Sequence, residues 1–454
     1  MKCAIFSHSF PSPFLVLLLA FFGVFSVSGT AAAQAVTSPA GYPVSEYLPA
    51  PAGETLVSFD WDGAGALYYM TGAPYPGMLL AVRRKSGGGT EELFRSTSVF
   101  PGSRATAVGP FVYFNDGGDF GRYSFDYFCH NTAAGGTPVR VYDSSAPEAL
   151  SLWGIDTRDG GQIFASGAVG FGDSSIFYQP LAQDGSLGSL VNLGTIGQAS
   201  GPAAFGPSGE MYYVYGYSYT GQLDLYRWNA GEVAAAITAP ALSPLNPSGH
   251  VWATPPNTFD GASGLVADAA GRVYVTVNKW GVQGELLMYR PDAAGAAMTP
   301  VVLARHSSDR LETLRIRDGA LYVNCVEGIF SLPLPLALQQ VDGGQVQAVA
   351  GKTANLAVQT VGGTGTIQYQ WYRMEDGKAD TPVGGNSPIL ALTPTLNDDG
   401  AAYYCAATDD YDTVNSAVFT LAVSPATPAA GTAALAALAL LVGALGGRRA
   451  MRRV

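Results

Sequence analysis

The sequence predicts an all-β protein whose main part is a β-propeller of six blades. One observation is a unit that recurs six times, in which a Gly-marked turn leads into an apolar, Tyr-rich strand and a second apolar strand follows. A strand-only repeat of about 50 residues is typical of propeller blades. A second observation is that Asp and Gly mark turns before these strands, as tight hairpins require. The Tyr-rich or aromatic strands begin at Leu67, Val112, Ile163, Met211, Val273 and Leu321.

The N-terminal residues 1–33 have the pattern of a secretory signal peptide. Lys2 precedes an apolar stretch over residues 14–27, and the small residues 30–33 follow before Gln34. A charged start, an apolar centre and a small-residue end form the signal that is cleaved on export. We therefore expect cleavage near Ala33 and an exported protein.

The C-terminal residues 425–454 have the pattern of a membrane segment. Prolines at 425 and 428 lead into the uncharged run 429–447, which four arginines follow at 448, 449, 452 and 453. A run of this length is just long enough to span a bilayer as a helix, and flanking arginines favour the cytoplasmic side. The sequence therefore predicts a C-terminal transmembrane helix.

This order of Pro-containing segment, apolar helix and Arg cluster resembles bacterial C-terminal sorting signals of the PEP-CTERM type. The resemblance implies a membrane sorting enzyme as partner, which would cleave the tail and release the protein. The chain has Pro-Ala-Thr-Pro-Ala-Ala where that family has Pro-Glu-Pro. A permanent C-terminal membrane anchor stays an equal alternative. Under either reading, residues 34–424 belong to the cell envelope or cell surface.

The charge of the chain excludes some partners. The formal net charge is −11. All 35 acidic residues lie between the two end segments, which hold five of the 24 basic ones, so the body is more acidic still. A body of this charge is a poor partner for nucleic acid or anionic lipid.

The propeller is expected over residues 43–335, with four strands in each blade. The first blade reads as strands over 56–62, 66–71, 78–84 and 91–95. The sixth blade has strands over 312–317, 321–324 and 329–332, but prolines at 333 and 335 follow where its outer strand would be. The extended segment 43–48 can supply that strand, which closes the ring and leaves no open sheet edge.

After a linker at 336–344, residues 345–424 change to a different pattern. Trp371 lies within Tyr-Gln-Trp-Tyr-Arg, and Asp-Gly-Ala-Ala-Tyr-Tyr-Cys runs from Asp399 to Cys405. This segment resembles an immunoglobulin-like domain of the I-set kind, which implies a β-sandwich with Trp371 in its core and Tyr403 at the tyrosine corner. Val358 stands where the family has its other cysteine, so we expect Cys405 to be a buried free thiol. The expected role is a spacer.

Residues that carry catalytic or metal chemistry are sparse. The three histidines of the body, His130, His250 and His306, are far apart in the sequence, and its three cysteines have no metal-ligand spacing. The body also has no nucleophile elbow, zinc-protease helix or phosphate loop. We therefore expect no catalytic residues, no metal and no cofactor.

Aromatic residues in the loops predict a binding surface. In a propeller, loops from second to third strands and loops between blades emerge on one face. Binding residues concentrate in such loops, and exposed aromatic rings suit sugar rings or apolar protein surface. The alternative is that these rings pack over the blade ends. The candidates are five residues of second-to-third loops plus a neighbour, and two residues of an expected inter-blade insertion at 239–263: Tyr75, Phe120, Phe171, Tyr217, Tyr219, Trp280, His250 and Trp252.

The sequence favours an exported protein whose propeller recognises extracellular polysaccharide or a surface protein without catalysis. Two other classes stay open: a propeller enzyme acting on glycans as lyase or hydrolase, and a purely structural envelope component. An enzyme should gather two carboxylates, or a His–carboxylate pair, at the axial opening of the binding face.

Overall fold

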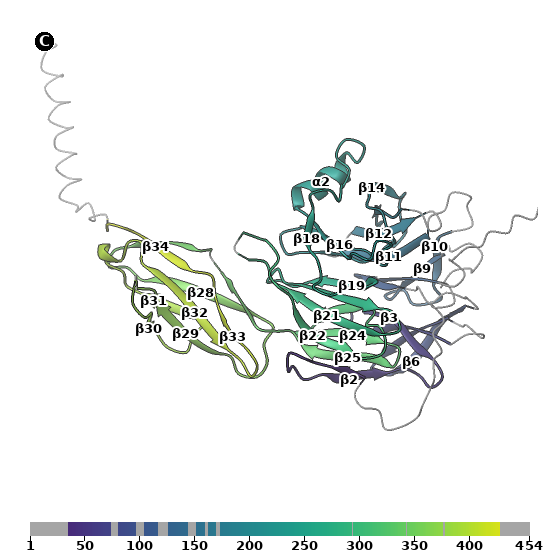
Figure 1. The fold of residues 1–454 in the computed structure, drawn as a ribbon, viewed down its shortest axis with the longest axis horizontal. Coiled ribbons are helices and arrows are strands. Elements are labelled where there is room, and N and C mark those ends of the chain that lie inside the picture. Colours follow the sequence, from purple (N-terminus) through teal and green to yellow (C-terminus); the bar gives the residue numbers. More distant parts are fainter. Residues whose placement is uncertain are drawn as a thin grey trace, which may run out of the picture. The chain divides into compact units, whose positions relative to one another are not determined.

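The computed structural model describes residues 35–73, 80–96, 104–116, 126–143, 151–158, 162–168, 173–292, 294–341, 343–375 and 377–426. The chain divides into two compact units, Met1–Leu334 and Pro335–Val454, and many of its strands are labelled in Figure 1. Each unit is described by itself below.

The described part of the first unit contains six antiparallel sheets. Four of them consist of four strands that follow one another along the chain, and each of the other two also includes a strand from the N-terminal segment. We call these sheets blades 1 to 6. Blade 1 has β3 (Thr55–Trp61), β4 (Leu67–Gly72), β5 (Leu80–Ser86) and β6 (Gly89–Ser96). Blade 2 has β7 (Ala105–Val108), β8 (Phe111–Asn115), β9 (Tyr127–Asn131) and β10 (Val139–Tyr142). Blade 3 has β11 (Ser151–Arg158), β12 (Gln162–Ala168), β13 (Ser175–Pro180) and β14 (Val191–Thr195).

Blades 4 to 6 continue the same order. Blade 4 has β15 (Ala203–Phe205), β16 (Met211–Val214), β17 (Leu225–Trp228) and β18 (Val251–Ala253). Blade 5 has β19 (Gly261–Ala267), β20 (Val273–Lys279), β21 (Gln283–Tyr289) and β22 (Val301–His306), with β1 (Val36–Thr37) as a fifth strand. Blade 6 has β23 (Leu314–Arg317), β24 (Ala320–Cys325) and β25 (Gly328–Pro333), completed by β2 (Ser45–Pro49).

The six blades form a closed ring. The first strands contact one another in chain order, from β3 through β7, β11, β15 and β19 to β23, and β24 contacts β3. At this closure the Thr313 hydroxyl donates to Ser58 Oγ over 2.9 Å, and the Asn324 amide donates to the Leu56 carbonyl over 3.1 Å. The all-β, propeller-like architecture expected from the repeat is confirmed.

The Tyr-rich second strands form the core between blades. Tyr68, Tyr113, Tyr213 and Tyr274 are fully buried on β4, β8, β16 and β20. Sheets packed face to face bury both sides of their inner strands, which explains why β8 has no exposed residue among its five.

Asp side chains shape the turns before these strands. Asp62 Oδ1 accepts the backbone N–H groups of Ala64 and Ala66, and Asp268 Oδ1 accepts those of Ala270 and Arg272. Each turn also places a Gly at positive φ, 91° at Gly65 and 77° at Gly271, where a side chain would be strained. The Asp–Gly signal in the sequence therefore has a direct structural cause.

The N-terminal segment closes blade 6 as expected. In the antiparallel pairing of β2 with β25, Ser45 is opposite Ser331 and Leu48 is opposite Ile329. The sequence did not predict the pairing of β1 with β22, which puts Val36 opposite His306.

A helix, α2 (Ala230–Thr238), lies in the connection from β17 to β18. Figure 1 shows this helix beside β14 and β18. Asn229 and Glu232 form a capping box, and Val233 and Ala236 face the core. The insertion expected between blades 4 and 5 is therefore in large part the link between the third and fourth strands of blade 4.

The second unit consists of two packed sheets. One has β26 (Ala337–Gln340), β28 (Ala354–Val361) and β31 (Ile389–Leu392). The other has, in spatial order, β27 (Gln345–Val349), β34 (Phe419–Ser424), β32 (Ala402–Thr408), β29 (Gln368–Arg373) and β30 (Thr381–Val383). The short strand β33 (Thr413–Asn415) also pairs with β32, and the 3-10 turn η1 (Leu396–Asp398) precedes β32 in the chain. Val358, Trp371 and Cys405 share its core, and Cys405 is buried and unpaired, as expected.

The expected linker at 336–344 needs correction. Ala337–Gln340 forms β26, which pairs with β28, and Leu338 packs against the core of the second unit. The prolines at 333 and 335 end blade 6, but the exposed edge of β28 offers hydrogen-bond partners to the chain that follows. Within the described residues, no helix is long and apolar enough to cross a membrane. The predicted signal peptide at 1–33 and apolar run at 429–447 lie outside those residues.

Candidate functional site

Loops of two classes meet on one face of the propeller-like unit. In blades 4 and 5, the Ser218 N–H of a second-to-third loop donates to the Asp260 carbonyl of an inter-blade loop over 2.7 Å. The Trp280 N–H of the next second-to-third loop donates to the Asp260 carboxylate over 2.9 Å. Asp260 thus ties three loops together on what we call the platform face.

Three of the predicted site residues form a cluster on this face. The rings of Tyr217 and Tyr219 meet edge to face with centroids 5.5 Å apart, and those of Tyr217 and Trp280 do so at 5.5 Å. The Arg310 guanidinium lies 5.6 Å from the Trp280 ring centroid. Tyr219 is 51% exposed, whereas Tyr217 and Trp280 are half-buried. We call Tyr217, Tyr219, Trp280 and Arg310 the aromatic platform.

The backbone around Tyr219 is held by a residue in an unfavourable conformation. Gln198 has a φ of 56°, which residues other than Gly rarely adopt, and its side chain accepts the Tyr219 N–H over 2.6 Å. Such strained residues gather at functional sites, because surrounding contacts must hold them there. Burial raises the pKa of Tyr219, and Tyr217 and Asp173 add to the effect, so its hydroxyl stays protonated and can donate a hydrogen bond.

His250 and Trp252 do not join the platform. His250 stacks on Trp228 with centroids 5.7 Å apart and lies 3.0 Å from Glu232 of α2. Trp252 packs on Tyr212 at 5.0 Å. The physical reason is that residues 251–253 form β18, so His250 precedes the fourth strand of blade 4 and lies near the opposite face.

The three remaining candidates, Tyr75, Phe120 and Phe171, lie outside the described residues. Of the eight predicted residues, the structure therefore brings together Tyr217, Tyr219 and Trp280 and separates His250 and Trp252 from them.

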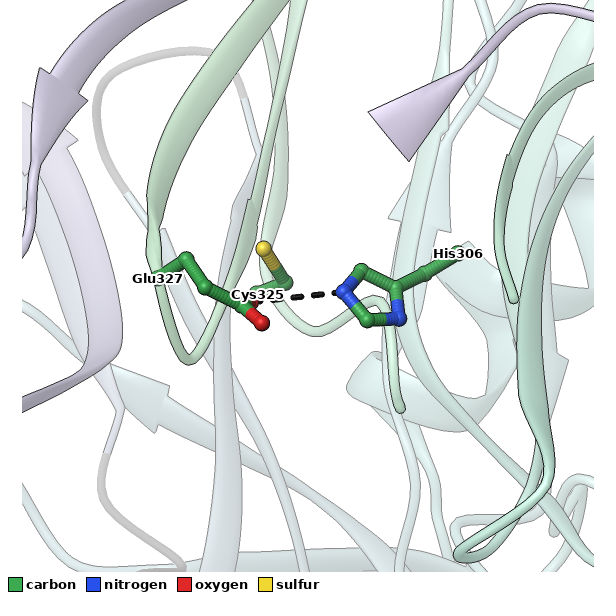
Figure 2. A group of neighbouring side chains, drawn as sticks. All are labelled: His306, Cys325 and Glu327. Atoms are coloured by element: carbon green, nitrogen blue, oxygen red, sulfur yellow. Dashed lines mark ion pairs between the residues drawn. The ribbon is translucent and has the colours of Figure 1, made fainter. Parts of the chain in front are cut away.

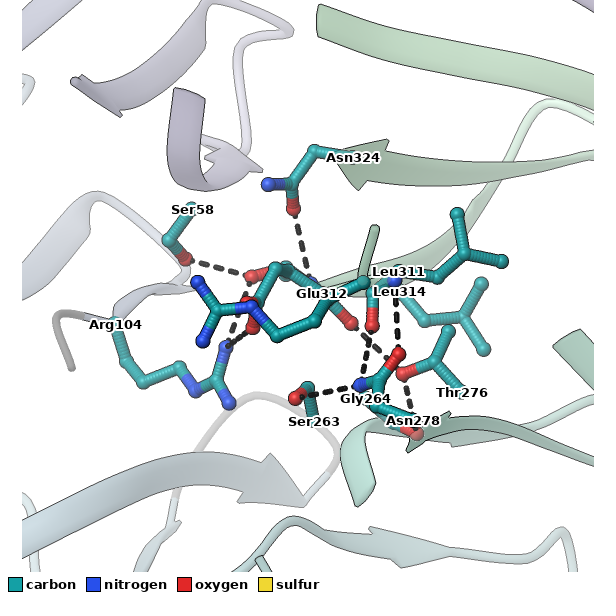
Figure 3. Close-up of polar contacts among 12 residues, drawn as sticks. Ser58, Arg104, Ser263, Gly264, Thr276, Asn278, Leu311, Glu312, Leu314 and Asn324 are labelled. Atoms are coloured by element: carbon teal, nitrogen blue, oxygen red, sulfur yellow. Dashed lines mark hydrogen bonds and ion pairs between the residues drawn. The ribbon is translucent and has the colours of Figure 1, made fainter. Parts of the chain in front are cut away.

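A polar cluster that the sequence did not reveal lies at the inner strands on the platform face. Figure 3 shows Glu312 facing Arg104, with 3.8 Å between the charged groups. Glu312 also lies 3.1 Å from Arg310 Nε, so one guanidinium connects this carboxylate with the Trp280 ring. Asp309 Oδ1 lies 3.9 Å from the same Nε, and burial raises the pKa of Asp309. Two carboxylates thus meet at one arginine.

His306, Cys325 and Glu327 form a second cluster on this face (Figure 2). Their ligand atoms lie within 4.8 Å of one another, which makes them a candidate metal centre. The sequence missed them because they come from two different blades. The signal was available in the topology, since β22 and β24 both end on the platform face.

The donor chemistry of this cluster disfavours a metal. The backbone N–H groups of Asp309 and Ser308 donate to His306 Nδ1 over 2.8 and 3.3 Å, so the ring proton belongs on Nε2, which faces Glu327 at 3.3 Å. A metal at Nε2 would need that nitrogen unprotonated. Burial, with the nearby Glu327 charge, raises the pKa of the Cys325 thiol well above its usual value, so it is not the thiolate that metals bind.

The same contacts fix Glu327 as an anion. Burial by itself would raise its pKa, but the contacts with His306 and Cys325 outweigh burial and lower it to about 2. The cluster therefore acts as a clamp, in which His306 connects the loop carrying Asp309 and Arg310 to the second-to-third loop of blade 6.

No protein-family model matches the sequence, and no curated protein matches it. Among solved structures, the chain is similar to prolyl oligopeptidase B from Galerina marginata, with a TM-score of 0.32, 11% identity and 64% of this chain covered. The chain spans 40% of the length of that protein. It is also similar to a mutant of the GH43 protein BlXynB from Bacillus licheniformis, with a TM-score of 0.31, 9% identity, and 84% of this chain and 88% of that chain covered. The sheet topology of this chain defines its class, an all-β protein with a propeller-like unit.

Proposed function

We propose that the protein is exported and that its propeller-like unit recognises an extracellular polysaccharide at the aromatic platform, without catalysis. The observation that carries the proposal is the grouping of Tyr217, Tyr219 and Trp280 on one loop face, with Tyr219 half exposed. Amphipathic rings of this kind stack on the C–H faces of sugars while their polar atoms reach hydroxyl groups.

In this proposal the second unit is an immunoglobulin-like spacer. Its support is the core shared by Val358, Trp371 and Cys405 and the pairing of Trp371 opposite Cys405 between β29 and β32. Export rests on the signal-peptide pattern at 1–33, and surface attachment rests on the apolar run at 429–447 with its arginines. Cell fractionation with mass spectrometry of both chain ends would distinguish a cleaved tail from a retained anchor.

The test of recognition is binding of the full chain to a glycan array, with a matched pair of tyrosine variants. Tyr219→Ala should weaken binding by about 2 kcal/mol, the scale of an exposed aromatic anchor. Tyr411→Ala is the control, because Tyr411 is 46% exposed on the second unit. Equal losses for the two variants, or unchanged binding by Tyr219→Ala, would contradict recognition at the platform. A protein partner instead of a glycan would show itself as capture of a surface protein that Tyr219→Ala abolishes.

A glycan-acting enzyme is the second candidate. The observation that favours it is the meeting of Asp309 and Glu312 at Arg310, because glycoside hydrolysis uses two carboxylates and a raised pKa suits a general acid. Glu312, however, faces two guanidinium groups, Arg104 and Arg310, which suits a structural ion-pair network at the inner strands. Release of reducing ends by the wild type, abolished in Glu312→Gln, would establish the enzyme. A chain that binds no ligand at all would be a purely structural envelope component.

A further inference from the structure

Among the residues that the structure describes, the charges around the aromatic platform are mostly negative. Arg310 is the cation in contact with it, and Arg104 and the exposed Lys279 are its other basic neighbours on the described loops. Carboxylates on the same loops and strand ends outnumber them: Asp173, Asp224, Asp260, Asp309 and Glu312.

The one cation on the platform is already engaged. Arg310 Nε lies 3.1 Å from Glu312, and the guanidinium covers the Trp280 ring at 5.6 Å. A carboxylated or sulfated sugar on the platform would have to displace Glu312 from this guanidinium and would leave that carboxylate less well paired. It would also approach an acidic body, whose field repels anions.

The exposed polar atoms near the rings suit hydroxyl groups. Asp173 is exposed, and its negative charge adds to the burial that raises the pKa of Tyr219. Ionised carboxylates accept hydrogen bonds only, so they match ligands that donate, and sugar hydroxyls do so.

We infer that the ligand of the platform is an uncharged polysaccharide, with sugar rings stacked on Tyr219 and Trp280 and hydroxyls donating to the surrounding carboxylates. This inference rests on the proposed function, and it goes further by excluding the acidic polysaccharides. The carboxylates act as the selectivity element, because they repel anionic sugars and accept from neutral ones.

The experiment compares polymers that share one backbone. A neutral glucan, mannan or galactan that binds the full chain is compared with the same polymer oxidised at C6 to the uronate, at low and high salt. We expect the neutral form to bind at least tenfold more tightly at low salt, and we expect salt to narrow the gap because screening weakens the repulsion. Binding of the neutral form should change little with salt.

A variant pair locates the effect. Asp173→Asn should raise the ratio of uronate to neutral binding severalfold, because the amide keeps an oxygen that accepts a hydroxyl but loses the charge that repels the uronate. Asp318→Asn is the control, because Asp318 is 80% exposed in the turn between β23 and β24, on the opposite face.

The outcomes separate the inference from the function on which it rests. Equal or tighter binding of the uronate form, or tighter binding of a cationic amino-sugar polymer, overturns the inference and leaves recognition at the platform standing. If the neutral, the uronate and the cationic polymers all fail to bind, the proposed function itself is contradicted.

Discussion

Single side chains hold the loops of the platform face in place. His306 accepts the Asp309 N–H on one side and meets Glu327 on the other, so one buried imidazole joins the loops of blades 5 and 6. In the second unit, Cys405 is buried in the core between the two sheets, beside Val358 and Trp371.

Replacing Glu327 with Gln should make stability less dependent on pH. The pKa of Glu327 is lowered from 4.5 to about 2 in the folded state, so the charged group stabilises the fold above pH 4.5 and this stabilisation is lost as the pH falls toward 2. The side chain is 47% exposed, so solvent screening should keep the effect below about 1 kcal/mol. Urea unfolding of both proteins across this pH range measures it. A difference in stability that stays constant from pH 7 to pH 2 would argue against the clamp.

Replacing Cys405 with Ala should lower the free energy of unfolding by roughly 1–3 kcal/mol through lost packing. Its thiol is fully buried and unpaired, and burial raises its pKa to about 11, so we expect no redox dependence. Thermal melts with and without reductant test this. A wild-type melting temperature that falls on adding reductant would speak for a disulfide.

At the scale of elements, β2 gives blade 6 its fourth strand and covers an aromatic group. Tyr47 of β2 meets Trp61 and Tyr322 edge to face, with centroids 5.9 and 5.1 Å apart. The segment therefore joins blade 6 to blade 1 through side chains as well as through the pairing with β25.

Deleting residues 35–50 should lower the melting temperature and cause aggregation, because the edge of β25 loses its partner. The control is deletion of residues 35–41, which removes only β1 and leaves blade 5 with four strands. Light scattering on heating compares the two. Equal behaviour of the two deletions would mean that β2 does not protect the ring.

Several elements could be predicted from the sequence because the signal is local. The strands of blades 1 and 6 follow apolar runs with Asp–Gly turns between their first two strands, and the structure has them within a few residues of their expected limits. β18 could not be predicted, because a strand of three residues between Gly- and Pro-containing segments shows no alternation. Without β18, His250 and Trp252 are expected in the loop between blades 4 and 5, whereas His250 precedes the fourth strand of blade 4 and Trp252 lies on it.

In the whole molecule, the closed arrangement of the six blades brings residues that are distant in the sequence next to one another. Tyr217, Tyr219 and Trp280 could be predicted to share a face because loop class fixes their side of the propeller. The contacts of Arg310 with Trp280 and Glu312, and of His306 with Glu327, depend on side-chain packing across a loop or between blades, for which spacing in the sequence carries no signal. The structure thus adds the charged groups beside the predicted aromatic ones.

If Trp280 belongs to a recognition surface, Trp280→Ala and Trp252→Ala should differ in their effect on binding. Trp280 lies on the platform, whereas Trp252 packs against Tyr212 and donates from Nε1 to the Gly295 carbonyl over 2.8 Å. Titration of the bound polysaccharide and urea unfolding are measured for both variants. Trp280→Ala should weaken binding by about 2 kcal/mol, whereas Trp252→Ala should lower stability by roughly 3 kcal/mol with affinity unchanged. Loss of stability without loss of affinity in Trp280→Ala would contradict the account.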